Sequence, residues 1–354
     1  MTSRRPRIAV VGAGWWATTR HLPSLASYDG AELVAVCDTR PERARAAAER
    51  FGVPVTATDL PSALAATHID GVVVATPHTT HYALARTALD AGVHVFVEKP
   101  LTTTAAEAWE LVERAEANGL HLSVGYTYHY TRAAQFVRHA VRERIGSLVC
   151  VAAQFTSSTL TLFAGGDDSA DPATPHPTTY ADPRLSGGGQ GHTQVTHLMG
   201  TVLWATGREV EEVFCYMDNR GCDVDVVDVM AFRFAGGGLG TVTSTGTALG
   251  HQPPRQRIQY FGTDGVVEQD LLGARAVLHR NDGAVVERAL DEGEPAYPAE
   301  APARAFADLI AGRGPNHAPG RDAAATVAFL DAAYRSAASG RAEPVLRRHH
   351  RCEP

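Results

Sequence analysis

Residues 7–17, with the sequence RIAVVGAGWWA, decide the fold of this 354-residue chain. The first five residues form an apolar run whose length and glycine-rich exit are typical of a buried parallel strand. Gly12 permits a tight turn, Gly14 lets the backbone approach a pyrophosphate at a helix N-terminus, and Ala17 keeps that helix close to the strand. The residues expected to contact a dinucleotide here are Gly12, Gly14, Trp15, Trp16 and Ala17.

A second apolar run, residues 32–37, ends in Asp38, roughly 20 residues past the glycine pattern. A carboxylate at this place binds both ribose hydroxyls and repels a 2′-phosphate, which predicts NAD as the cofactor. Arg40 can accept that phosphate, so NADP is the alternative cofactor. The competing interpretations are a purely structural glycine turn, and a surface role for Arg40 at the start of the next helix.

The rest of the N-terminal part alternates between apolar runs and helical patterns. Strands are expected over 70–75, 93–97 and 120–124, and helices over 41–51, 79–90 and 104–118. This alternation predicts an α/β fold, in which a Rossmann domain over residues 1–125 has a parallel sheet with helices on both faces.

The pattern changes after residue 125, where a second domain is expected over 126–354. A helix over 131–144, a strand over 148–156, a long functional loop over 164–191 and a helix over 192–206 come first. Seven strand-like runs between 211 and 290 then predict an open, mainly antiparallel sheet. Two final helices, 301–311 and 321–338, are expected to pack back on the Rossmann domain, and the Arg-His cluster at 347–351 to be a solvated tail.

Composition excludes several classes of protein. With 44% hydrophobic and 20% charged residues and a net charge of −7, the chain is an ordinary globular protein and no general nucleic-acid binder. It contains no apolar run of about 18 residues and no apolar signal segment near its first residues. Five cysteines without C-x-x-C or zinc spacing predict free thiols in a reducing cytosol, hence a cytoplasmic protein without a metal site.

Lys99 is the only lysine among 32 basic residues; all the others are arginines. Arginine serves as a surface cation, but it cannot exchange a proton at working pH because its pKa lies above about 12. The residue is therefore either a chance survivor of an arginine-rich codon bias or a residue that must titrate.

The neighbours of Lys99 favour chemistry. Glu98-Lys99-Pro100 directly follows the strand over 93–97, at the sheet edge where doubly wound folds bind ligands. Hydride transfer from an alcohol needs a group that takes the hydroxyl proton, and a lysine in a partly dry site can do so. His197, at the end of the glycine-rich segment 187–197, is a second catalytic candidate, although a lone helical histidine is more often structural.

Together these motifs resemble the Gfo/Idh/MocA family, named after glucose-fructose oxidoreductase and inositol dehydrogenase. The resemblance implies pyridine-nucleotide-dependent oxidation or reduction of a sugar or cyclitol hydroxyl, and a homodimer or homotetramer formed through the free face of the C-terminal sheet. It implies that Lys99 is the acid/base residue and His197 its neighbour at the substrate. It rests on the pattern at 12–17, Thr76-Pro77 with His81, Gly92-x-His94-Val95, Glu98-Lys99-Pro100 and segment 187–197. By the same resemblance, Thr76 and Pro77 flank the cofactor, and His81 and Glu98 belong to its site.

Two departures from the family pattern concern the substrate. Thr193 stands where family members commonly have Asp, so a neutral hydroxyl replaces a carboxylate that would keep the lysine charged. His129, after Gly125-Tyr126, stands where the family often has Arg, which makes phosphate binding there less favourable. The substrate-binding residues expected are Lys99, Tyr126, His129, Tyr180, Thr193 and His197.

The loop 164–191 is rich in acidic residues. Its members Asp167, Asp168, Asp171 and Asp182, with His176 and Tyr180, form either a solvated loop or a lid that recognises an amine.

The sequence thus predicts an NAD(P)-dependent dehydrogenase or ketoreductase for a sugar, aminosugar or cyclitol, with a role in antibiotic sugar biosynthesis as one setting. Two alternatives stay open: a glycoside hydrolase that uses bound NAD for transient oxidation and elimination, and a non-catalytic nucleotide-sensing regulator.

Overall fold

The computed structural model describes residues 4–166 and 174–348. It contains two sheets, formed by segments within residues 7–124 and 148–344. The predicted α/β class is confirmed. The predicted domain boundary at residue 125 falls between the two sheets and stays a prediction.

The first sheet is entirely parallel, with strand order β3-β2-β1-β4-β5-β6. Its strands are β1 (Arg7–Val11), β2 (Glu32–Cys37), β3 (Val55–Ala57), β4 (Gly71–Val74), β5 (His94–Val97) and β6 (Leu122–Val124). Alternate residues face opposite sides, so Val10 and Val73 enter one apolar cluster, while Val72 and Val74 enter another. Both faces are therefore buried, as the continuous apolar runs predict.

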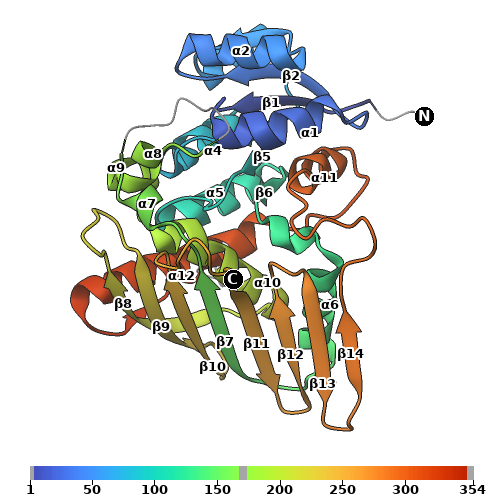
Figure 1. The fold of residues 1–354 in the computed structure, drawn as a ribbon. Coiled ribbons are helices and arrows are strands. Elements are labelled where there is room, and N and C mark those ends of the chain that lie inside the picture. Colours follow the sequence, from blue (N-terminus) through green and yellow to red (C-terminus); the bar gives the residue numbers. More distant parts are fainter. Residues whose placement is uncertain (1–3, 167–173, 349–354) are drawn as a thin grey trace, which may run out of the picture.

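Helices cover this sheet on both faces (Figure 1). They are η1 (Ala17–His21), a π-helical turn leading into α1 (Leu22–Ala26), then α2 (Pro41–Phe51), α3 (Leu60–Ala66), α4 (His81–Asp90), preceded by the short η2 (His78–Thr80), and α5 (Ala105–Ala117). β3 and α3 were not expected from the sequence. β3 is three partly exposed residues, and α3 begins where Asp59 accepts a hydrogen bond from the Ser62 amide at 2.8 Å.

The second sheet has strand order β14-β13-β12-β11-β7-β10-β9-β8-β15, and only the β7–β10 pair is parallel. Its strands are β7 (Leu148–Thr156), β8 (Val210–Asp218), β9 (Val227–Phe234), β10 (Leu239–Thr245), β11 (Gln256–Gly262), β12 (Gly265–Asp270), β13 (Arg275–Arg280), β14 (Val285–Arg288) and β15 (Glu343–Pro344). The expected mainly antiparallel sheet is confirmed.

Helices α6 (Arg132–Glu143), α10 (Thr196–Thr206) and α12 (Gly320–Ser339) cover one face of this sheet (Figure 1). The short η3 (Thr127–Tyr130) joins β6 to α6, and η4 (Gly191–Val195), a second π-helical turn, leads into α10. α12 also packs on α5, while α11 (Ala301–Ile310) packs on α1, β4 and β5 of the first sheet.

The segment expected as one long loop contains helical turns. α7 (Leu160–Phe163) precedes it, and α8 (Pro177–Ala181) and α9 (Pro183–Ser186) lie within it. The N-cap of α9 is Asp182, whose side chain accepts a hydrogen bond from the Arg184 amide at 2.9 Å. The other loop acids, Asp167, Asp168 and Asp171, lie outside the described residues. Residues 349–351 of the predicted tail also lie outside the described residues. Arg348, which is described, forms an ion pair with Glu116.

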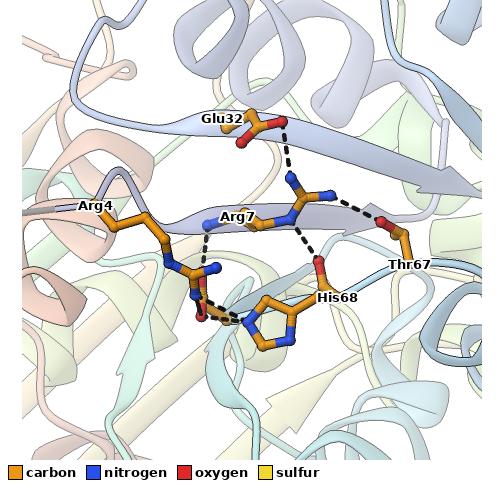
Figure 2. A network of polar contacts seen from close by, with 6 residues as sticks. Arg4, Arg7, Glu32, Thr67 and His68 are labelled. Carbon is orange, nitrogen blue, oxygen red and sulfur yellow. Dashed lines mark hydrogen bonds and ion pairs between the residues drawn. The ribbon is translucent and has the colours of Figure 1, made fainter.

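A polar network closes the amino edge of the first sheet, on the side opposite to where its strands end (Figure 2). The Arg7 guanidinium donates to Glu32, to the Thr67 hydroxyl and to the His68 carbonyl oxygen at 2.8–2.9 Å. Arg4 lies beside His68 in the same network. These contacts join the starts of β1 and β2 to the segment before β4, and leave the carboxyl edge open.

No helix in the described part of the chain is long and apolar enough to cross a membrane. The four cysteines that it includes are all free thiols: Cys37, Cys150, Cys215 and Cys222.

Candidate active site

A cleft of about 980 Å³ lies at the carboxyl edge of the first sheet. One end is lined by residues that follow β1, β2 and β3, including Gly12, Gly14, Asp38 and Arg40. The other end adds residues from the second half of the chain, including Tyr180. Both halves of the chain therefore build one site.

The glycine turn fits a bound dinucleotide. Gly12 has φ +95°, and a Cβ there would overlap the Ala75 carbonyl oxygen, so this position requires glycine. A Cβ at Gly14 would meet nothing within 4 Å, which leaves its backbone open to the cleft. Trp15 and Trp16 line the cleft beside it, and Ala17 is fully buried under the turn. The geometry leaves room for a pyrophosphate at this turn, and the binding role of these residues stays a prediction.

Asp38 is held at the end of β2 by two main-chain donors. Its Oδ2 accepts from the Ala13 amide at 2.8 Å and its Oδ1 accepts from the Arg40 amide at 2.9 Å. Each carboxylate oxygen keeps a further lone pair for a ribose hydroxyl. Arg40 and Arg43 line the cleft next to it.

Thr76 and Pro77 line the middle of the cleft, whereas His81 lies behind them. The His81 ring is fully buried, with Nε2 2.9 Å from the Thr76 carbonyl oxygen and Nδ1 2.8 Å from that of Pro100. His81 therefore joins the two loops that border the cleft without lining it.

Glu98 is fixed by an indole and an imidazole. Its Oε1 accepts from Trp16 Nε1 at 2.8 Å and lies 2.8 Å from His21 Nε2. A Cβ at position 125 would come within 2.7 Å of this carboxylate, so Gly125 makes room for it. Burial raises the pKa of Glu98, but the hydrogen bond and charge of His21 and the charge of Lys99 outweigh it, and the net pKa is lowered. Glu98 is therefore an anion next to the lysine.

Lys99 extends across the cleft. Its Nζ donates to the main-chain carbonyl oxygen of Thr193 at 3.0 Å. Burial lowers the pKa of Lys99 to about 8, although the Glu98 carboxylate raises it. An amine with this pKa can both take and return a proton near neutral pH.

His197 lines the cleft from the first turn of α10. Burial and the charge of Lys99 lower its pKa well below the ordinary value, so its ring is neutral. The ring packs edge-on against Tyr128, with centroids 5.7 Å apart, and its Nδ1 is buried without a hydrogen-bond partner. A neutral imidazole next to an amine can orient a hydroxyl group, but it carries no charge.

The family model for oxidoreductases with an NAD-binding Rossmann fold matches residues 6–126, and that for the GFO/IDH/MocA C-terminal domain matches residues 135–268. Myo-inositol 2-dehydrogenase of Thermotoga maritima is 30% identical over 273 residues, which cover 75% of each chain. The chain belongs to the Gfo/Idh/MocA oxidoreductase family. The predicted family and the NAD-binding domain are thereby confirmed.

Two further proteins are similar to a shorter part of the chain or to its whole structure. The 4-carboxy-2-hydroxymuconate-6-semialdehyde dehydrogenase of Sphingobium is 33% identical over 135 residues, which are 38% of this chain and 42% of that protein. The chain aligns with only 38–42% of the length of this and two further curated relatives. The crystal structure of GenD2, from gentamicin A biosynthesis, in complex with NAD superimposes with a TM-score of 0.79 and 26% identity over 98% of both chains.

The structure of this family member brings most of the expected substrate residues to the cleft, but not all. Lys99, Tyr180, Thr193 and His197 line it. His129 does not, because its fully buried ring stacks on Trp204 with centroids 4.3 Å apart. Tyr126 stacks on the His129 ring, with ring centroids 5.2 Å apart, and is also buried, with 1% of its surface exposed. The expectation that these two residues bind substrate is not supported by their position.

Several cleft residues were not expected from the sequence. Tyr297 comes from the segment before α11, and His78 from the turn after β4. Tyr297 packs against Trp16 and Tyr128, with ring centroids 6.4 and 5.1 Å away. No local pattern marks Tyr297, because only the folding of α11 onto the first sheet brings it to the site.

Proposed function

We propose that this chain is an NAD-dependent dehydrogenase or ketoreductase that acts on a secondary hydroxyl of a sugar, aminosugar or cyclitol. The observation that carries the proposal is the position of the sole lysine, with its pKa lowered to about 8, in a cleft shared with the dinucleotide turn. Bound nicotinamide would accept or donate the hydride. The chain's own residues supply the proton transfer, the orientation of the substrate and the exclusion of water.

The proton step belongs to Lys99. In the oxidative direction its neutral amine takes the hydroxyl proton and becomes an ammonium, and in the reductive direction the ammonium returns that proton to the new alkoxide oxygen. The Glu98 carboxylate stabilises the ammonium form, and the Thr193 carbonyl holds the nitrogen in place. His197, as a neutral ring, orients the hydroxyl group.

The lining of the substrate end supports an unphosphorylated substrate. Among the described residues that line it beyond Glu98 and Lys99, none is an arginine or a carboxylate; they include Thr159, Leu162, Tyr180, Gln194 and Tyr297. Phosphate recognition favours a forked arginine donor. Arg184, which lies in the segment before the glycine-rich turn, is paired with Asp182 at 2.7 Å. That pairing also reduces what Asp182 can offer to an amine.

The test is the absorbance at 340 nm with NAD across sugars, inositols and aminoglycosides, followed by matched neutral, aminated and phosphorylated sugars at low and high salt. We expect net NADH formation with a neutral or aminated ring. A preference for the phosphorylated member contradicts the substrate class. Glycoside cleavage without net NADH supports the hydrolase alternative, and nucleotide binding without turnover of any member supports the regulator.

We also propose that the chain forms a homodimer or homotetramer through the face of the second sheet that the helices leave open. Exposed apolar residues lie on this face of β8, β9, β10 and β14, namely Tyr216, Val229, Leu239 and Val285. Tyr216 and Val229 are direct cross-strand partners. Apolar residues exposed on one sheet face favour association with a second copy.

A further inference from the structure

One buried residue, Asp225, anchors the glycine-rich segment that precedes Thr193, whose carbonyl oxygen accepts from Lys99. Three successive main-chain amides donate to Asp225: Gly189 to Oδ1 at 2.7 Å, Gln190 to the main-chain oxygen at 2.8 Å, and Gly191 to Oδ2 at 2.7 Å. The Tyr334 hydroxyl also donates to Oδ1, at 2.8 Å. Asp225 is 4% exposed and lies just before β9, far in sequence from all four donors.

The glycines of this segment serve close packing against that anchor. A Cβ at Gly189 would overlap the Asp225 carbonyl oxygen, and a Cβ at Gly188 would overlap the Tyr334 hydroxyl. A Cβ at Gly191 would come within 2.6 Å of the same hydroxyl. None of these three glycines has a positive φ, so conformational freedom does not explain them. Close contact with Asp225 and Tyr334 is what requires glycine at these three positions.

The anchored turn continues directly into the catalytic lysine's contact. Gly191 begins η4, whose Thr193 carbonyl accepts from Lys99 Nζ, and the Thr193 amide donates to the Gly189 carbonyl oxygen at 2.9 Å. His197 follows in the first turn of α10. π-helical turns are rare in proteins, and those that occur are often found at functional sites. The turn in this chain is fixed at its first residue, Gly191, by the Asp225 carboxylate.

A second buried carboxyl group, Asp228, lies in β9 close to the anchor. Burial and the charge of Asp225 raise the pKa of Asp228 well above its ordinary value, so Asp228 is the neutral member of the pair. Asp225 is the member of the pair whose carboxylate oxygens accept hydrogen bonds, from two amides and the Tyr334 hydroxyl.

We propose that Asp225 is a positioning residue for the proton-transfer site: it fixes the turn that presents the Thr193 carbonyl and His197 to Lys99. This inference rests on the proposed role of Lys99. Asp225 does not line the cleft and does not contact Lys99. It acts on Lys99 indirectly, because it binds the amides of residues 189–191 and thereby places the Thr193 carbonyl oxygen.

The test uses the fact that the chain has one lysine. Reductive methylation with ¹³C-formaldehyde labels Lys99 and the terminal α-amine, so NMR follows the titration of the Lys99 side chain without cofactor or substrate. In Asp225→Asn, the amide nitrogen cannot accept, and the turn loses part of its anchor. Because burial is the main cause that lowers the pKa of Lys99, a looser turn admits water, and we expect the titration midpoint to rise by at least about 0.5 unit. We expect kcat to fall about tenfold while the KM for NAD stays within twofold.

Asp228→Asn is the matched control, because asparagine closely resembles the protonated carboxyl already present there. We expect the Lys99 titration midpoint of this variant to equal that of wild type, and its kcat to stay within twofold of wild type. Tyr334→Phe removes one donor to Asp225 and keeps the three amides, so the same changes are expected at smaller size. If Asp225→Asn does not fold, Tyr334→Phe decides the question.

An unchanged Lys99 midpoint and kcat in folded Asp225→Asn would overturn the proposal, as would equal effects of Asp228→Asn. Without a folded Asp225→Asn protein, an unchanged Tyr334→Phe would overturn it. The titration is read from the protein alone, so it remains informative if no substrate is found. A Lys99 midpoint that moves in a protein without dehydrogenase activity contradicts the proposed function, and it supports only the statement that Asp225 fixes the turn beside Lys99.

Discussion

The side-chain nitrogen of Lys99 donates to the main-chain carbonyl oxygen of Thr193 at 3.0 Å, across the cleft between the two halves of the chain. The contact is made by the backbone, and the Thr193 hydroxyl is buried without a partner. A carbonyl is a neutral acceptor, so it holds the amine without raising its pKa as strongly as a carboxylate would. A neutral contact of this kind fits the neutral side chain at position 193, and it leads to the first three predictions.

Lys99→Arg should lower turnover by about 10²–10⁴-fold, because arginine keeps the charge but does not exchange a proton at working pH. NAD binding, measured by fluorescence or calorimetry, should stay within a few-fold of wild type. His197→Ala serves for comparison, and it should raise the KM for substrate more than it lowers kcat. A Lys99→Arg protein with more than a tenth of the wild-type rate would show that another group moves the proton.

The pH dependence should follow the pKa of about 8 for Lys99. Oxidation needs the neutral amine, so kcat/KM for oxidation should rise with pH through about 8, and reduction should fall over the same range. Because the Glu98 charge raises this pKa, Glu98→Gln should move both limbs to lower pH, while its amide oxygen can still accept from Trp16 and His21. A shift to higher pH would mean that Glu98 does not stabilise the ammonium form.

Thr193→Asp should have the opposite effect. A carboxylate beside the amine favours the charged form, so the pKa of Lys99 should rise and the oxidation limb should move to higher pH. Thr193→Asn has nearly the same shape without the charge, and its limb should stay near that of wild type. If both variants shift alike, the change comes from packing at position 193 and not from charge.

Much of this site could be predicted from the sequence because its signals are local. The turn at Gly12 and Gly14, the acid at the end of β2 and the lysine after β5 each follow a strand, and parallel strands end at the same edge. Lys99 is the only lysine in the sequence, and its place directly after a strand favoured a chemical role over a chance survivor of codon bias.

The parts that could not be predicted depend on contacts distant in sequence or made by the backbone. Any residue at position 193 has a carbonyl oxygen, so residue type gives no sign that this one meets Lys99. The same holds for the three amides that bind Asp225. His129 was expected at the substrate because of the family resemblance, whereas its stacking on Trp204 comes from the packing of η3 against α10.

The proposed oligomer can be tested at the Tyr216–Val229 pair on the open sheet face. Val229→Arg places a charge beside Tyr216 and should shift the wild-type dimer or tetramer toward monomer in size-exclusion chromatography with light scattering at about 10 μM. Leu249→Arg is the control, because Leu249 is 55% exposed but lies outside the strands of the sheet. A monomeric wild type, or dissociation by both variants, would remove this face as the interface.

Cofactor choice should depend on Asp38 more than on its basic neighbours. Its carboxylate is held by the Ala13 and Arg40 amides, so it cannot swing away from a 2′-phosphate placed at the end of β2. We expect wild type to prefer NAD, and Asp38→Ala to narrow the ratio of kcat/KM for NAD over NADP by at least about tenfold. Arg40→Ala should change the ratio in the other direction, because it removes a cation that favours the phosphate while leaving the carboxylate in place. A wild type that prefers NADP, with Arg40→Ala reversing that preference, would mean that the guanidinium outweighs the carboxylate at this end of the cleft.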